Sequence, residues 1–337
     1  MLAIFLYSAN ALLPIALLTA LGYFLKRKKV ISIDFLKNGN KLLFNVFIPV
    51  LIFYSIYCTE DLSGINWPLI LFILLAVLLL FFLGLLIIKL FVKDPKCKGV
   101  VLQSVFRSNY SIISLPLVMA LGVSGGLSLA SFLSAFIIPL YNVLAVISLT
   151  VFLKKEKEKG QFKKVLKGIL TNPLILSSVL GIVVLLLRQF VFTMPNGELS
   201  FSIARDLPFI DKCLSYVSEA TTPLSLLVLG GLLNFDAVRG KTGVIVLGTF
   251  CSIVLAPAVA LLLAVVCSEA GLITCTAAEF AVLIATFAAP IAFASAIMAE
   301  EMGNDGDVAR QIVAWTSILS IFTLFITVSL FKYLGLL

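Results

Sequence analysis

Long apolar runs are the feature that most constrains this sequence. They recur along all 337 residues, and one of them, LILFILLAVLLLFFLGLLII at 69–88, contains no polar residue. About 20 apolar residues in a helix cross the roughly 30 Å hydrocarbon core of a bilayer. The runs do not alternate polar with apolar residues as the strands of a membrane barrel do, so helices are expected. The sequence predicts ten spans, at about 5–25, 36–58, 67–92, 99–121, 127–153, 166–192, 211–233, 243–267, 277–299 and 310–334.

Composition and charge agree with a multi-pass protein of the cell membrane. Hydrophobic residues make up 61% of the chain and charged residues 12%, which excludes a soluble domain. The first run reads as a span because it ends in basic residues and has no signal-peptide cleavage site. Most Lys and Arg residues fall in alternate loops, which are expected to be cytoplasmic, with both termini outside. These loops contain 26–29, 93–98, 154–167 and 239–241.

Several classes of partner and chemistry are unexpected. The net charge of +8 follows from the loops and needs no nucleic acid, although anionic membrane lipids would gather there. The chain has no His, and its six Cys lack a C-x-x-C spacing, so neither a metal nor another cofactor is predicted. Cys267 and Cys275 either pair across an outer loop or stay free and buried. Without His, no nucleophile and base pair suggests an enzyme, and GKT at 240–242 lacks the other residues of a phosphate-binding loop.

Proline spacing divides the chain into two related halves. Pro49 and Pro116 are 67 residues apart, as are Pro223 and Pro290. The charged stretch KKEKEKGQFKK lies between these two pairs of prolines. We therefore expect a five-helix repeat at 1–153, a basic cytoplasmic linker at 154–165 and a second repeat at 166–337. Because five is odd, the second repeat enters the membrane in the opposite sense. An all-α fold with a 5+5 inverted repeat is therefore predicted.

The fourth and ninth spans are predicted to be broken and to cross. Pro116 and Pro290 disfavour helical geometry at Leu115 and Ala289 and free carbonyls one turn earlier. Such backbone groups survive in a membrane only against protein, water or ligand. Each proline is also suited to start a half-helix, whose positive dipole end would face an anion. The alternative is that both prolines merely kink ordinary helices.

Polar residues gather at the first of these breaks. Asn109 can hold a carboxylate or a freed carbonyl, or it can join two helices by a hydrogen bond. Arg107 is a charge inside a span, which suggests attraction of an anion; it can instead snorkel to the cytoplasmic surface or pair with an acid. The predicted substrate site comprises Arg107, Asn109, Ser111, Ser114, Leu115, Pro116, Ala289, Pro290 and Ile291.

Glu219 is a candidate for proton coupling. It precedes Pro223 by four residues, about one helical turn, in the seventh span. Burial there would raise its pKa towards neutrality, whereas a small error in the span's boundary would leave it in outer solvent.

Short motifs along the whole chain resemble the auxin efflux carrier family, which includes plant auxin exporters of the PIN type and bacterial permeases for malate and other organic acids. They are a first span with Pro14, Gly22 and Tyr23, FIPVLIF at 47–53, TNPLI at 171–175, TPLSLLVLGGLL at 222–233, PIAFASAIMAEEMG at 290–303, and Asn109 followed by Pro116. Arg107, Ser111 and Ser114 depart from the family pattern.

The resemblance implies a secondary transporter of a small organic anion, with an elevator or rocking movement. Spans one, two, six and seven would form the scaffold, and spans three to five with eight to ten would move. The rival functions are a sodium- or proton-coupled cation antiporter, which needs a midplane carboxylate pair, and a membrane receptor that does not transport. A homodimer is also considered.

Overall fold

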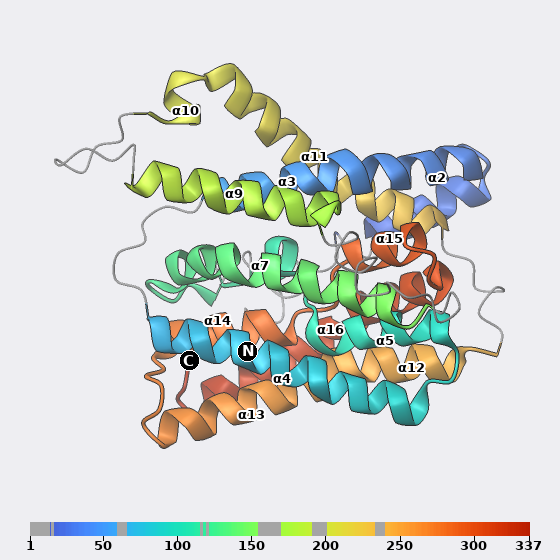
Figure 1. Ribbon diagram of the computed structural model, residues 1–337. Coiled ribbons are helices and arrows are strands. Elements are labelled where there is room, and N and C mark those ends of the chain that lie inside the picture. Colours follow the sequence, from blue (N-terminus) through green and yellow to red (C-terminus); the bar gives the residue numbers. More distant parts are fainter. Residues whose placement is uncertain are drawn as a thin grey trace, which may run out of the picture.

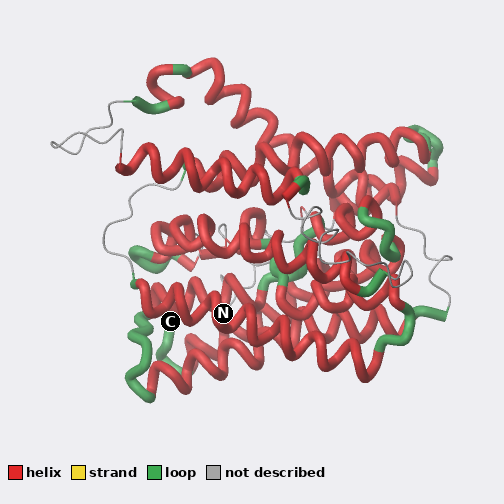
Figure 2. The backbone as a smooth tube through the Cα atoms, viewed as in Figure 1, coloured by secondary structure: helices red, strands yellow, loops and turns green. Residues whose placement is uncertain are grey.

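The structure, a computed structural model, describes residue 14 and residues 17–58, 66–114, 117–118, 121–153, 170–190, 201–232 and 240–337. In these residues all regular structure is helical and no strand occurs (Figure 2). Four helical stretches are long and apolar enough to cross a membrane: Trp67–Phe91, Phe132–Val151, Thr242–Glu269 and Gly306–Tyr333. They coincide with the predicted third, fifth, eighth and tenth spans.

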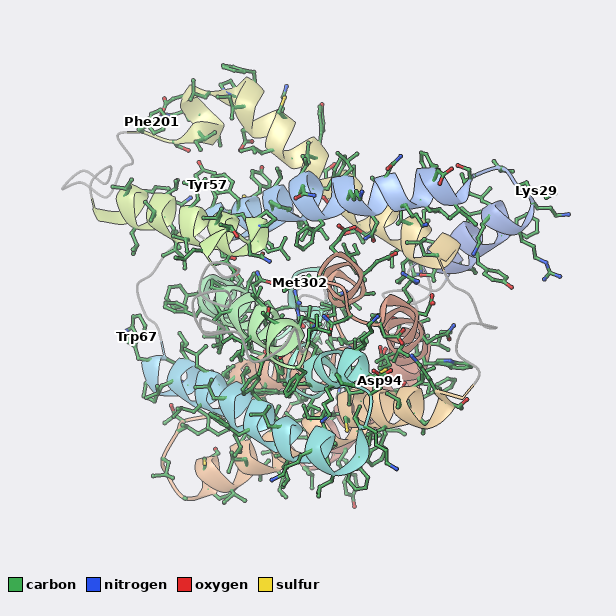
Figure 3. The ribbon with its side chains drawn as sticks, turned by 45° about the vertical axis from the view of Figure 1, so that its right-hand side comes forward. Lys29, Tyr57, Trp67, Asp94, Phe201 and Met302 are labelled. Carbon is green, nitrogen blue, oxygen red and sulfur yellow. The ribbon has the colours of Figure 1, made fainter. Side chains whose placement is uncertain are left out.

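The helices pack in two layers, which Figure 1 shows one above the other. The upper layer contains helices whose closest packing is with each other, above all α3 with α9 and α11. In Figure 3, Lys29, Tyr57 and Phe201 mark this layer. Its elements are α2 (Ile33–Leu42), η1 (Leu43–Phe47), α3 (Ile48–Tyr57), α9 (Pro173–Phe190), α10 (Ile203–Asp206) and α11 (Pro208–Leu232), together with a helix over 17–27.

The lower layer contains the remaining helices, with Trp67 and Asp94 on it in Figure 3. Its α7 also packs against α9 and α3 of the upper layer. The elements are α4 (Trp67–Phe91), α5 (Pro95–Phe106), η2 (Tyr110–Ser114), α7 (Gly126–Val151), α12 (Thr242–Phe250), η4 (Cys251–Leu255), α13 (Ala256–Glu269), α14 (Ala277–Ala288), α15 (Ala294–Glu301) and α16 (Gly306–Tyr333).

Capping residues set where the spans of the lower layer begin. The Asn66 side chain accepts from the amide of Leu69 at the start of α4, and Asp305 accepts from the amide of Val308 at the start of α16. Thr276 and Glu279 form a capping box at the start of α14. Each cap satisfies amides that have no partner within the helix, so polar residues end the apolar runs.

Two glycines bring the first helix of the chain against α11. A Cβ on Gly22 would lie 2.1 Å from the carbonyl oxygen of Leu227, and one on Gly230 would lie 1.8 Å from that of Thr19. The two backbones therefore touch, as they do where small residues face each other between membrane helices. This contact fixes the helix over 17–27 in the upper layer.

Besides η2, two other spans of the described residues contain a π-helical turn. In the upper layer η1 separates α2 from α3, and in the lower layer η4 separates α12 from α13. Pro49 and Pro257 follow within the first two positions of α3 and α13. Proline has no amide to donate, so the hydrogen-bond ladder is interrupted at these points and the π turn absorbs the change.

All six cysteines are free thiols. Cys267 and Cys275 are both half-buried and do not form a disulfide. The alternative of a disulfide across the loop between α13 and α14 is therefore wrong.

Candidate functional site

Two helix interruptions meet inside the lower layer. Helix α5 ends at Phe106, the chain becomes extended at Arg107 (φ −103°, ψ 118°), and η2 begins at Tyr110. Helix α14 ends at Ala288, Ala289 is extended (φ −67°, ψ 145°), and α15 begins at Ala294. The amide of Asn109 donates a hydrogen bond to the carbonyl oxygen of Pro290 at 2.8 Å, which joins the two interruptions.

The described residues contain an interruption that the prolines do not predict. It covers 107–109, whereas the predicted break at Leu115 and Pro116 lies outside the described residues. The second interruption lies at its proline, Pro290. The interruption at 107–109 has a tertiary reason, because the free amide of Asn109 is satisfied by the other interruption.

A pocket of about 50 Å³ opens where the interruptions meet the upper layer. Its wall combines residues of the first interruption, the start of α15, the middle of α7 and the first turns of α3. This volume holds a few water molecules. The lining residues are Ile48, Leu51, Ile52, Arg107, Ser108, Asn109, Tyr110, Ile138, Tyr141, Asn142, Ala292, Phe293 and Ala294.

Arg107 is the charged residue of this pocket, and its side chain is buried with 6% exposed. Its Nη1 donates to Oε1 of Gln103 at 3.0 Å and contacts Sδ of Met298 at 2.9 Å, while Nη2 donates to Oδ1 of Asn142 at 3.0 Å. No carboxylate of the described residues forms an ion pair with it. The guanidinium therefore neither snorkels to the surface nor pairs with an acid, and a buried charge held only by neutral groups favours an anionic ligand.

Asn109 faces the same pocket. Its backbone carbonyl accepts from the amides of Ile113 and Ser114, so the main chain is occupied. Its side-chain amide forms no hydrogen bond with any other described residue, although only 6% of Asn109 is exposed. An amide that both donates and accepts, and that borders open volume, is suited to a polar ligand.

The other predicted site residues lie close by but differ in their contacts. Ser111 is part of η2, and Oγ of Ser114 donates to the carbonyl oxygen of Ala285 on α14 at 2.5 Å. Ala289, Pro290 and Ile291 form the buried second interruption, whereas the pocket wall begins one residue later, at Ala292. Ser114 thus joins η2 to α14.

Sequence reasoning missed the partners of Arg107. Gln103, Asn142 and Met298 contact its guanidinium. Asn142 also lines the pocket, as does Tyr141, whose hydroxyl lies 3.2 Å from that of Ser108. Asn142 is the amide side chain inside the span at 127–153, and a polar residue in the middle of a span is a signal that could have found it.

Glu219 does not belong to this pocket. It lies on an exposed face of α11, where Oε1 accepts from the hydroxyl of Ser215 at 2.7 Å. The structure brings Arg107 and Asn109 together, and leaves Glu219 in the upper layer.

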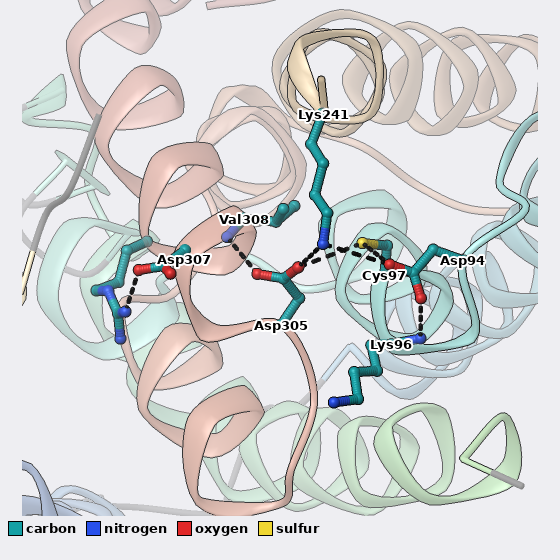
Figure 4. A network of polar contacts seen from close by, with 8 residues as sticks. Asp94, Lys96, Cys97, Lys241, Asp305, Asp307 and Val308 are labelled. Atoms are coloured by element: carbon teal, nitrogen blue, oxygen red, sulfur yellow. Dashed lines mark hydrogen bonds and ion pairs between the residues drawn. The ribbon is translucent and has the colours of Figure 1, made fainter. Parts of the chain in front are cut away.

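A separate cluster ties together the ends of three helices of the lower layer (Figure 4). Nζ of Lys241 bonds the carboxylates of Asp305 and, at 3.3 Å, Asp94. Asp94, Cys97 and Asp305 are close enough to ligate a cation, but the ammonium group of Lys241 already supplies the positive charge. Burial acts to raise the pKa of Asp305, yet hydrogen bonds from Lys241 and the amide of Val308 outweigh it and hold that pKa below its usual value.

A helical fold with several apolar spans, and a buried polar pocket between two layers, are typical of a multi-pass membrane protein that handles a polar ligand. Residues 7–328 match the family model described as membrane transport protein, and the chain belongs to that family, which is the auxin efflux carrier family. The resemblance drawn from the motifs is confirmed. The protein is thus a multi-pass membrane transporter and not an enzyme.

Two archaeal relatives support the assignment. An uncharacterised transporter of Methanocaldococcus jannaschii is 27% identical over 236 residues, covering 68% of this chain and 70% of that protein. An uncharacterised transporter of Methanothermobacter thermautotrophicus is 25% identical over 326 residues, covering 95% of this chain and 97% of that protein. The similarity spans both halves of the chain.

Proposed function

We propose that the protein is a secondary transporter that moves a small organic anion, a carboxylate, across the cell membrane by an elevator-type movement. The lower layer would carry the site and move against the upper layer, which would act as the scaffold. The division of the helices into two layers supports this proposal, because it follows the division into a scaffold and a moving unit that the family resemblance implies.

The observation that carries the proposal is the environment of Arg107. Its guanidinium lies in a pocket whose other polar groups are neutral, and no described carboxylate balances it. Burying a charge without a partner of opposite charge costs several kcal/mol. An anion in this pocket would supply that partner, and its attraction to the guanidinium of Arg107 would not be reduced by a neighbouring carboxylate. The starts of η2 and α15 border the same pocket, and their positive dipole ends add to that attraction.

The composition of the pocket wall supports a carrier with alternating access. Ile48, Leu51 and Ile52 come from the upper layer, and the rest of the wall comes from the lower layer. Sliding the layers would therefore open the pocket without unfolding either wall.

The proposal keeps the predicted topology of ten spans in a 5+5 inverted repeat, with broken, crossing fourth and ninth helices. Both termini would lie outside, and the loops with Lys93, Lys96, Lys98 and Lys241 would lie in the cytoplasm. The pseudo-twofold axis would run through the pair of interruptions. Anion binding at such a pair is consistent with the hydrogen bond between Asn109 and Pro290.

A cation antiporter is less favoured than an anion carrier. It needs carboxylates at the site, and the pocket wall contains none while containing Arg107. A receptor without transport would have no need of a wall shared between two layers.

Reconstitution in liposomes tests the proposal. Charge movement or uptake is recorded when acetate, lactate, malate and indole-3-acetate are applied in turn to the wild-type protein, Asn109→Ala and Arg107→Gln. Saturable transport of one or more acids, weakened in both variants, is the expected result. Currents driven only by sodium or pH jumps would replace the anion carrier with the antiporter, and binding without uptake of any label would favour the receptor.

A further inference from the structure

Among the described residues, two side-chain hydrogen bonds cross the boundary between the layers. Nδ2 of Asn142, on α7 of the lower layer, donates to Oγ of Ser178 on α9 of the upper layer at 3.2 Å. Nδ2 of Asn40, on α2 of the upper layer, donates to Oε1 of Glu301 on α15 at 3.1 Å. Asn142, the donor of the first bond, also contacts Arg107, the charged residue of the pocket. The second bond joins Asn40 to Glu301, which does not line the pocket.

The first bond belongs to a directed chain. Nη2 of Arg107 donates to Oδ1 of Asn142, Nδ2 of Asn142 donates to Ser178, and Oγ of Ser178 donates to the carbonyl oxygen of Leu174 at 2.8 Å. A guanidinium only donates, so Oδ1 of Asn142 must face it and Nδ2 must face the upper layer. Because the Ser178 proton is used on Leu174, its oxygen is free to accept.

Burial makes each step of this chain costly to break. Asn142 is 1% exposed and Ser178 is 0% exposed. An N–H group that loses its acceptor in such a place bears its full desolvation penalty. If α7 slid along α9 in an empty carrier, Nδ2 of Asn142 would be left in that condition.

We propose that Asn142 is a positioning residue that couples the anion at Arg107 to release of the upper layer. This inference rests on the proposed function, since it needs both an anion and a sliding movement. Asn142 borders the pocket next to the guanidinium, so a carboxylate bound to Arg107 offers oxygens that replace Ser178 as the acceptor. The loaded carrier then slides at lower cost than the empty one, and the protein exchanges anions across the membrane faster than it moves them in one direction.

Ser178→Ala is the informative variant, with Ser177→Ala as its matched control. Ser177 lies beside it on α9 and donates to the same carbonyl oxygen of Leu174 at 3.0 Å, a hydrogen bond within that helix. Without the Ser178 hydroxyl, the Asn142 amide has no acceptor in the resting position either, so sliding of the empty carrier no longer costs this hydrogen bond, while the bond of Asn40 to Glu301 is the same in both variants. Both variants lose one buried hydroxyl, so a general loss of packing affects them alike.

The first measurement compares exchange with net uptake of radiolabelled lactate and malate in liposomes. In the wild type, exchange is expected to exceed net uptake; Ser178→Ala is expected to raise net uptake about five- to tenfold towards the exchange rate, the effect of one buried hydrogen bond. Ser177→Ala should keep the wild-type ratio. Equal ratios in the three proteins would overturn the coupling while leaving the transport function intact.

The second measurement needs no substrate. Spin labels at Lys37→Cys on α2 and Lys93→Cys beyond α4, in a chain whose exposed and half-buried cysteines are replaced by serine, report the distance between the layers. Both lysines are exposed. Ser178→Ala should add a second distance in the empty protein that Ser177→Ala lacks. A single unchanged distance in Ser178→Ala would refute the tether, and failure of the wild type to transport any acid would instead refute the proposed function.

Discussion

The amide of Asn109 and the carbonyl oxygen of Pro290 are joined by a hydrogen bond of 2.8 Å between two interrupted helices. The bond satisfies one donor and one acceptor that the interruptions expose, so neither interruption is complete without the other. The pocket forms beside this bond, with Arg107 in its wall.

Arg107→Gln is expected to lower the rate of anion transport at least about tenfold without lowering the melting temperature. The arginine is buried without an acidic partner among the described residues, and removing a costly buried charge is neutral or stabilising when polar contacts remain. Uptake in liposomes and thermal unfolding in detergent check the two parts. Arg310→Gln is the contrasting variant, because Arg310 bonds Glu300 and Asp307 and its loss leaves two carboxylates uncompensated. Equal stability losses in the two variants would contradict this account.

Asn109→Ala and Ser114→Ala should separate binding from stability. The Asn109 side chain has no hydrogen-bond partner among the described residues, so its removal should raise KM and spare the free energy of unfolding. Oγ of Ser114 bonds the carbonyl oxygen of Ala285, so its removal should cost about 1 kcal/mol. Transport kinetics and chemical unfolding of both variants provide the comparison. A drop in stability for Asn109→Ala would show that its amide serves the fold.

Gly230→Ala should strongly destabilise the protein. Its new Cβ would lie 1.8 Å from the carbonyl oxygen of Thr19, and backbone cannot yield as a side chain can, so a loss of about 2 kcal/mol or more is expected. Gly243→Ala is the matched control, since no atom lies within 4 Å of its Cβ position and alanine favours a helix. Melting temperatures of the two variants test this, and comparable values would mean that the first helix does not pack on α11 as described.

The contribution of Asp305 to stability should depend on pH. Its pKa is held below the usual value of 3.8, so the folded protein favours the carboxylate, and the resulting stability is present above pH about 4 and lost as pH falls through the folded pKa. The pKa of Lys241 is raised, first by its hydrogen bond to Asp305, so the lysine stays charged throughout this range.

The measurement is the melting temperature of wild type and Asp305→Asn between pH 3 and pH 8. The wild type should be the more stable protein near neutrality, by about 1 kcal/mol in the free energy of unfolding for a partly exposed pair. The matching difference in melting temperature should be constant near neutrality and shrink below pH about 4. Asp305→Ala should cost more, because it also removes the acceptor for the amide of Val308. A difference that grows as the pH falls would have the wrong sign for this ion pair.

The sequence predicted what local chemistry decides. Apolar runs predicted helices, and Pro290 predicted an interruption at its own position, because a missing amide acts wherever the residue stands. Of the ten predicted spans, four coincide with described helices that are long and apolar enough to cross a membrane. Several of the others are interrupted or begin with charged residues, as α2 and α11 do.

The first interruption could not be predicted in the same way. It depends on a partner at Pro290, 181 residues later in the chain, and no propensity of Arg107 or Asn109 reports that contact. Asn142 escaped notice for a similar reason. A single amide in an apolar span gains its meaning only when packing brings Arg107 to one side of it and Ser178 to the other.

The π turn η1 accommodates one more residue than an α turn would hold, while the helices on either side of it keep their rotational phase. Deleting one residue within Leu43–Phe47 would therefore restore a regular α-helical ladder and leave Ile48, Leu51 and Ile52 on the pocket wall. A one-residue deletion between Ile48 and Leu51, where no such turn lies, would instead rotate the residues that follow by about 100°. The spare residue of this span is thus stored in η1, and the span tolerates a change of length there that it does not tolerate one turn later.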